Sequence, residues 1–147
     1  MKTAMSSHLT VQAEPAAVQE VEAFVTAFAE QQGIDTGDQH RITILLEELV
    51  TNLYAHGLVE RSGGCTAEIE LSLEQDRLSI EFSDNGKPFD PLAQPLPDLD
   101  VPAESRLPGK LGLHILRAFV DEASYRRNGD RNVLQMVRRI TITAPAQ

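Results

Sequence analysis

Residues 47–57 read EELVTNLYAHG and end a run of apolar residues that recur at helical spacing. Spacings of three and four residues predict the buried face of a helix, and the apolar positions are Ile42, Leu45, Leu46, Leu49 and Leu53. Asp38 is a suitable N-cap before this run, and Gly57 would stop it. We therefore expect a helix from Asp38 to about His56.

Two polar side chains of this helix, Glu48 and Asn52, stand four residues apart at the edge of the apolar stripe. At that spacing the two side chains lie one above the other. A carboxylate there can act as a general base, and a carboxamide oxygen can bind magnesium together with phosphates and waters. A solvated helix flank would carry the same pair, so the pair alone leaves both interpretations open.

A second polar stretch, DNGKPFDP at residues 84–91, follows a predicted strand directly. Asp84 can accept a hydrogen bond from an amine such as that of adenine, and Gly86 can let a flat base approach the backbone. Asn-Gly is also a strong turn signal, so an ordinary turn is the alternative.

A third stretch, GKLGLHILR at residues 109–117, leads into another predicted helix. Glycines before a helix expose backbone N–H groups at its positive end, which suits a phosphate, and Lys110 would add charge. The alternative is a helix start that needs two flexible residues. The stretch contains no Walker A pattern, and no strand-linked G-x-G-x-x-G is present.

The remaining patterns place these stretches in the order β-α-α-β-β-lid-α-β-β. The expected elements are a strand around residues 9–11, a helix over 15–32, a hairpin of strands over 66–73 and 78–82, a third helix ending near 122, and strands over 124–127 and 132–142. Six of the eight prolines lie between Pro88 and Pro108, so a flexible lid is expected over about 88–110. This order predicts an α+β, two-layer sandwich, in which helices cover one face of a mixed, mostly antiparallel sheet.

Composition limits the kinds of partner. The 147 residues include 13 Lys and Arg against 22 Asp and Glu, a formal charge of -9, which argues against direct binding of nucleic acid or an anionic membrane. Cys65 is the single cysteine, so no internal disulfide can form and a reducing compartment fits best. The first ten residues lack the apolar core of a signal peptide. We expect one cytoplasmic domain spanning residues 1–147.

Taken together and in this order, the three stretches resemble the ATP-binding domain of the GHKL superfamily, known as the Bergerat fold. Within that superfamily the chain is most similar to the stand-alone anti-sigma-factor serine kinases. The resemblance covers about residues 9–139 and includes the tail from Val120 through Tyr125 to Leu134. It implies a histidine-kinase-like ATPase domain with a flexible ATP lid.

The resemblance also implies roles for individual residues. Glu48 would be the general base, in preference to the adjacent Glu47, and Asn52 would bind Mg²⁺. Asp84 would contact the adenine amino group, and Gly86 would lie beneath the base. The full set assigned to ATP or ADP is Asn52, His56, Asp84, Gly86, Lys87, Pro88, Phe89, Gly109, Lys110, Leu111, Gly112 and Leu113. His56 also suits a helix C-cap.

Two positions depart from the pattern of many superfamily members. Pro88 stands where a second glycine is usual, and Lys110 follows Gly109 where an extra glycine is common. A Pro-Phe-Asp-Pro run at the first of these positions is itself frequent in the stand-alone subfamily.

The function that the resemblance implies is that of an ATP-dependent serine protein kinase and partner switch. It would phosphorylate a STAS-type anti-sigma-factor antagonist on serine and sequester a sigma factor or a surrogate target, and it would be able to form a homodimer. Two alternatives stay open: a nucleotide-binding module that sequesters without phosphorylating, and a detached catalytic domain of a histidine kinase.

Overall fold

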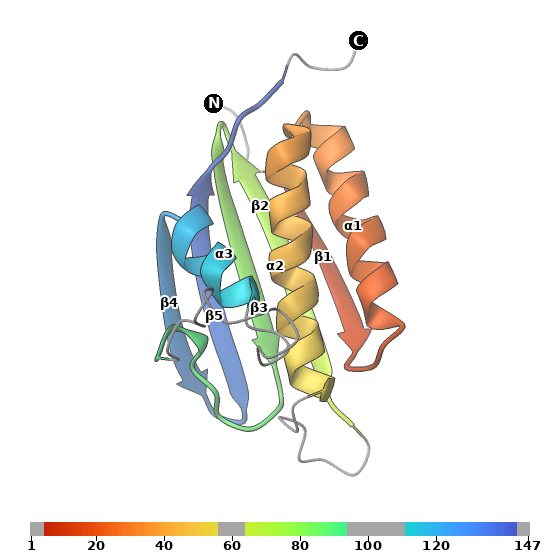
Figure 1. Cartoon of the computed structure of the whole chain (residues 1–147), viewed down its shortest axis with the longest axis vertical. Coiled ribbons are helices and arrows are strands. Elements are labelled where there is room, and N and C mark those ends of the chain that lie inside the picture. The colour runs from red at the N-terminus through yellow and green to blue at the C-terminus, as the bar shows by residue number, and fades with distance from the viewer. Residues whose placement is uncertain (1–4, 56–63, 94–110, 144–147) are drawn as a thin grey trace, which may run out of the picture.

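The computed structural model describes residues 5–55, 64–93 and 111–143. The elements in these ranges are β1 (Met5–Gln12), α1 (Ala17–Gln32), α2 (Thr36–Ala55), β2 (Thr66–Glu74), β3 (Arg77–Asp84), the 3₁₀ turn η1 (Pro91–Ala93), α3 (Leu111–Phe119), β4 (Glu122–Asn128) and β5 (Arg131–Arg139). Figure 1 shows the three α-helices on one face of the sheet. The predicted α+β, two-layer architecture and its element order are confirmed.

The sheet has the strand order β1-β2-β3-β5-β4, and each of these four pairings is antiparallel. The described strands therefore form a purely antiparallel sheet rather than the mixed one that the expectation allowed. In the register of the β3–β5 pair, Asp84 lies directly opposite Asn132. Pairing of two strands distant in sequence thus places the start of β5 beside the end of β3.

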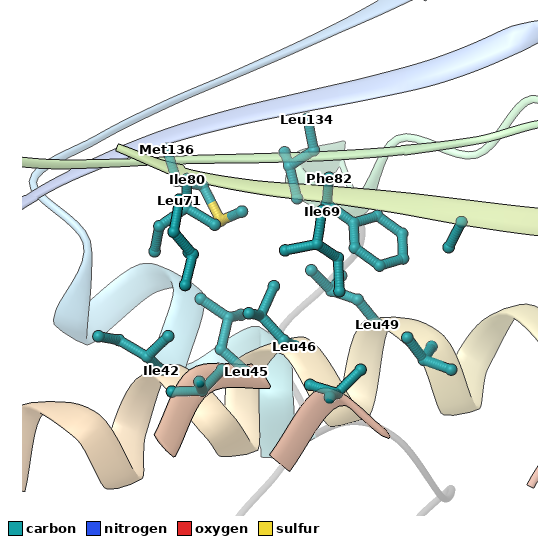
Figure 2. Close-up of a cluster of buried hydrophobic side chains, with 14 of the residues drawn as sticks. Ile42, Leu45, Leu46, Leu49, Ile69, Leu71, Ile80, Phe82, Leu134 and Met136 are labelled. Atoms are coloured by element: carbon teal, nitrogen blue, oxygen red, sulfur yellow. The ribbon is translucent and has the colours of Figure 1, made fainter. Parts of the chain in front are cut away.

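The core lies between α2 and the inner face of the sheet (Figure 2). The apolar stripe predicted for α2 faces residues from three strands; the labelled side chains are Ile42, Leu45, Leu46, Leu49, Ile69, Leu71, Ile80, Phe82, Leu134 and Met136. All ten are buried. Removal of this much apolar surface from water is the main driving force for folding, and it fixes α2 rigidly against the sheet.

The start of α2 differs from the prediction. The helix begins at Thr36, and the Asp35 carboxylate accepts hydrogen bonds from the backbone N–H groups of Gly37 (3.0 Å) and Asp38 (3.3 Å). Asp35 is therefore the N-cap, and the assignment of Asp38 to that role is wrong. Asp38 is instead buried in the first turn, where its Oδ2 accepts a 2.7 Å hydrogen bond from the Thr141 backbone.

The C-terminal end of the described chain is held by the connection between α1 and α2. Gly33 ends α1 at a φ of 72°, in the left-handed region that glycine favours. The Asp35 N–H donates to Thr141 O at 2.9 Å, and the Thr143 N–H donates to Gly33 O at 2.8 Å. This explains why β5 ends at Arg139 rather than at residue 142: the chain leaves the sheet to pair with residues 33–35.

The other differences lie at element ends. α3 ends at Phe119, three residues before the predicted limit, because the Asp121 N–H already pairs with Val137 O (2.8 Å) beside the start of β4. Of the predicted lid, residues 88–93 are described, and residues 94–110 lie outside the described part of the chain. Its first residues pack against the protein: Pro91 is buried, and the Leu92 N–H donates to Asp90 Oδ1 at 2.9 Å.

No helix within the described ranges is both long enough and apolar enough to cross a membrane.

Candidate functional site

Asp84 is the last residue of β3 and is 7% exposed. Its Oδ1 accepts two hydrogen bonds of 2.9 Å, one from the Gly86 N–H and one from Asn132 Nδ2. Both bonds end on the same oxygen, so Oδ2 keeps its capacity to accept a hydrogen bond from another group.

The electrostatic surroundings of Asp84 act in opposite directions. Burial raises the pKa of its carboxyl above the ordinary value of 3.8. The hydrogen bonds from Asn132 and Gly86 lower that pKa, as do the charges of Arg131 and Arg127, without cancelling the effect of burial.

Asn132 joins Asp84 to the loop that follows it. Its Nδ2 also donates to Lys87 O (2.7 Å), and its Oδ1 accepts from the Phe89 N–H (3.1 Å) and from the Tyr125 hydroxyl (2.5 Å). Both amide protons and the amide oxygen of this 6%-exposed side chain are therefore engaged. Because the partners differ on its two sides, the amide has one favoured orientation.

A second contact fixes the same loop from β4. Arg127 Nη1 donates to Gly86 O at 2.8 Å, and its Nε donates to Gly129 O at 3.1 Å. The loop after β3 is thus held by side chains of both C-terminal strands. The Asn85 side chain contacts a different strand: its Oδ1 accepts a hydrogen bond of 2.9 Å from the N–H of Thr66, the first residue of β2.

A small cavity adjoins Asp84. Its lining comes from α2, the ends of the strands and the segment after β3, and consists of Leu49, Asn52, Leu53, Phe82, Asp84, Phe89, Pro91, Tyr125, Asn132 and Leu134. Most of these groups are apolar, with a few polar groups at fixed places, as is usual for small-molecule sites. The cavity volume is about 30 Å³, well below the roughly 300–1,000 Å³ of a typical ligand pocket.

A purine would therefore enter only after one wall has moved. Helix α2 and the strands are held by the core, whereas Phe89 lies in the irregular segment between β3 and η1 and the buried Pro91 is the first residue of η1. The Phe89 side chain is partly exposed and can turn while its backbone N–H stays bonded to Asn132 Oδ1, so it is the part of the wall that can move with the least loss of contacts.

Helix α2 brings Asn52 to the cavity, as the spacing in the sequence suggested. Glu48 lies one turn earlier and is partly exposed. Its neighbour Glu47 lines a different groove, between α1 and α2, together with Glu22 and His40.

The pKa of Glu47 is raised, first by desolvation and then by the negative charges of Glu22 and Glu48, while His40 lowers it. The position of Glu47 against α1 separates it from the cavity. Glu48 is not among the residues that line the cavity either, so its choice as the acid–base residue of the pair stays a prediction.

The remaining predicted residues divide into two groups. Gly86 is buried, Phe89 lines the cavity, and Lys87 and Pro88 are exposed beside it, with the Lys87 carbonyl held by Asn132. His56, Gly109 and Lys110 lie outside the described residues. Leu111, Gly112 and Leu113 form the first turn of α3, but their side chains are outside the described part.

The metal ligand predicted from the sequence, Asn52, lies at the cavity. Within the described ranges there is no group of three or more His, Cys, Asp or Glu residues able to hold a metal. The carboxamide oxygen of Asn52 at the cavity suits a magnesium ion that takes most of its ligands from phosphates and waters.

Sequence reasoning assigned no role to Tyr125, Arg127 or Asn132. A signal for Asn132 was present, because it falls in phase with Leu134 and Met136 on the buried face of β5. A polar residue in a buried register needs hydrogen-bond partners. The bond from Arg127 to a backbone carbonyl 41 residues away carries no such signal.

Comparison with known proteins gives the family of this chain. The profile of the histidine kinase-like ATPase domain matches residues 11–138, and the chain belongs to that family. The family resemblance inferred from the three sequence stretches is thereby confirmed.

Among curated proteins, the chain is 31% identical over 97 residues to the serine/threonine-protein kinase BtrW of Bordetella bronchiseptica. The match covers 65% of this chain and 66% of BtrW, just under two thirds of that protein's length.

Two solved structures support the fold. The structure of the RsbU and RsbW domains of Rv1364c from Mycobacterium tuberculosis aligns with a TM-score of 0.64 and 20% identity, over 95% of this chain and 34% of that one. The blue-light activated histidine kinase EL346 of Erythrobacter litoralis aligns with a TM-score of 0.52 and 16% identity, over 85% of this chain and 41% of that one.

Proposed function

We propose that this protein is an ATP-dependent serine/threonine protein kinase that works as an anti-sigma factor in a partner switch. It would phosphorylate a STAS-type antagonist on serine and sequester a sigma factor or a surrogate target, in the cytoplasm. The observation that carries the proposal is the buried Asp84, which has an available acceptor oxygen and shares a cavity with Asn52.

The residues fit an adenine nucleotide. A flat base suits a cavity walled by apolar side chains such as Phe82 and Leu134, and its exocyclic amine suits Asp84 as the acceptor. Asn52 would contribute an oxygen ligand to Mg²⁺, which when bound would neutralise charge on the phosphates. Backbone N–H groups at the N-terminus of α3 would hold phosphate oxygens.

Glu48 would take the proton from the serine hydroxyl of the antagonist as that oxygen attacks the γ-phosphate. The new bond joins the serine oxygen to phosphorus, the bond between the β and γ phosphates breaks, and ADP leaves. The similarity to a protein named as a serine/threonine kinase supports this reaction over transfer to histidine.

The experiment that tests the proposal is transfer of labelled γ-phosphate from ATP to a purified STAS partner, in parallel with nucleotide affinity. Phosphoserine on the partner is the expected product, and acid-labile phosphohistidine would contradict it. ATP binding without transfer to any STAS partner would favour a module that only sequesters.

Asn52→Ala tests the magnesium ligand. Removal of the carboxamide should weaken ATP binding in the presence of Mg²⁺ by about 10-fold or more, while binding in EDTA changes much less. Phosphotransfer should fall with it. Titration calorimetry with and without Mg²⁺ measures the difference.

Thr51→Ala, at the preceding helix position, is the control and should behave as wild type. Equal weakening of ATP binding with and without Mg²⁺ would show that Asn52 supports the pocket rather than the ion.

A further inference from the structure

The contacts of Asn132 have a consequence for specificity. Its side chain contacts both Asp84, the expected partner of the base, and the backbone of the loop after β3 at Lys87 and Phe89. It is buried, and its two amide protons go to Asp84 Oδ1 and Lys87 O.

We propose that Asn132 is a positioning residue that makes the cavity select a purine with an exocyclic amine over one with a carbonyl at the same place. It does so by holding Asp84 Oδ1, so that Oδ2 is left as the acceptor for the amine. This inference rests on the proposed function, because it takes the ligand to be a purine nucleotide.

The argument begins with the orientation of the amide. Phe89 N–H and the Tyr125 hydroxyl both donate to Oδ1 of Asn132, so the oxygen side faces these two groups. The NH₂ side then faces Asp84 and the Lys87 carbonyl. A flipped amide would place its NH₂ against the Phe89 N–H donor and its oxygen against two acceptors, losing three hydrogen bonds, and only the Tyr125 hydroxyl could turn to restore its own.

The second step concerns the carboxylate. With the Gly86 N–H and Asn132 Nδ2 both on Oδ1, rotation of the Asp84 carboxylate would lose two bonds in a buried place. The carboxylate is therefore preorganised, and the ligand does not have to order it on binding. A carbonyl oxygen in place of the amine would face Oδ2 as acceptor against acceptor.

Asn132→Leu tests this inference, because leucine has a similar volume and no hydrogen-bonding groups. Affinity is measured for ATP and for inosine triphosphate, which has a carbonyl where ATP has the amine. In wild type we expect ATP to bind about 100-fold more tightly than inosine triphosphate. In Asn132→Leu the affinity for ATP should fall about 10- to 100-fold and that for inosine triphosphate less than about threefold.

A matched control is available on the same strand. Gln135 is also an amide of β5 that donates to a carboxylate of β3, Glu81 Oε1, at 2.9 Å, but this pair is exposed on the opposite face of the sheet. Gln135→Leu should leave both affinities unchanged.

A second variant covers the case in which Asn132→Leu fails to fold. Asn132→Asp keeps the shape and the acceptor for Phe89 and Tyr125 but replaces the donor with a second carboxylate oxygen beside Asp84. At alkaline pH both carboxylates are charged and repel each other. As the pH falls, the pair takes up one proton, and the protonated carboxyl at position 132 can again donate to Asp84.

The affinity of Asn132→Asp for ATP should therefore rise as the pH is lowered from about 9 to about 6, a range in which wild-type affinity should stay nearly constant. The charged groups facing Asp84 are Arg127 of β4 and Arg131 of β5, and arginines keep their charge throughout this range. The nucleotide's own titration is common to both proteins and cancels in the comparison.

The outcomes separate this inference from the proposed function. Loss of ATP and inosine triphosphate affinity by the same factor in Asn132→Leu would show a merely structural role and overturn the inference, without contradicting the proposed function. A flat pH profile in Asn132→Asp would do the same. If wild type binds neither nucleotide, the proposed function fails, and the inference fails with it.

Discussion

Asp84→Asn should lose most of its ATP binding. We expect an affinity at least about 100-fold below that of wild type and almost no rise in melting temperature with ATP and Mg²⁺, since that rise reflects binding to the folded state. The physical reason is the direction of the hydrogen bonds. The Gly86 N–H and Asn132 Nδ2 already donate to Oδ1, so they will hold the oxygen of the new amide.

The NH₂ group of that amide will then stand where Oδ2 stood, donor against the donor of the adenine amine. Asp90→Asn is a matched control from the same loop, because its Oδ1 contact with the Leu92 N–H survives in an amide. An ATP-dependent melting shift in Asp84→Asn equal to that of wild type would remove Asp84 from the adenine site.

The acid dependence of binding follows from the same residue. Protonation would turn Oδ2 of Asp84 from an acceptor into an O–H donor that faces the adenine amine, so affinity should fall as the pH drops through the pKa of Asp84. Because burial raises that pKa above 3.8, the loss should begin at a higher pH than for an exposed aspartate.

The parts of the fold that could be predicted from the sequence are those with a clear hydrophobic period. The α2 stripe and the alternation in β2 and β3 place buried residues such as Leu45, Ile69 and Ile80 correctly, because these positions follow the apolar spacing. Helix ends were less predictable, because they depend on tertiary contacts. Aspartate is a favoured N-cap residue, so Asp38 was a reasonable prediction. In the structure Asp35 is the N-cap, and the Asp38 carboxylate instead accepts a hydrogen bond from the Thr141 N–H.

In the candidate site, too, residues on regular elements could be predicted and features set by tertiary contacts could not. Asp84 and Asn52 could be placed from the sequence, since one ends a strand and the other lies on a regular helix. The hydrogen bonds that join Asn132 to Asp84 and to Tyr125 could not be predicted, because they depend on the pairing register of β3 with β5 and of β4 with β5. The alternation of β5 could have marked Asn132 as buried, but not its partners.

Glu48→Gln should separate phosphate transfer from nucleotide binding. Glutamine has nearly the same size and helix propensity as glutamate but cannot take up the proton of the serine hydroxyl. Phosphotransfer should therefore fall by about 10²- to 10⁴-fold, the usual contribution of a general base. Affinity for ATP should stay within about threefold of wild type, because Asp84, Asn52 and the start of α3 are unchanged. Sigma-factor binding should survive as well.

The adjacent Glu47 provides the decisive control. Glu47→Gln makes the same chemical change one position earlier, on the side of α2 that lines, with His40, the groove against α1 and its Glu22. Transfer of labelled phosphate to the STAS partner should be unaffected. A rate loss in Glu47→Gln and none in Glu48→Gln would move the base to Glu47, and equal losses in both would indicate a general effect of charge on α2.

Thermal stability provides a second way to recognise Glu47→Gln. The pKa of Glu47 is higher in the folded protein than its ordinary 4.5, so its charge costs stability at neutral pH, and this cost disappears as the pH falls below the unfolded value. Glu47→Gln should then melt slightly higher than wild type at pH 7, with the gain shrinking as the pH falls toward the ordinary pKa of glutamate. A variant that is fully active and slightly more stable, next to one that is folded, binds ATP and is inactive, would assign the proton transfer to Glu48.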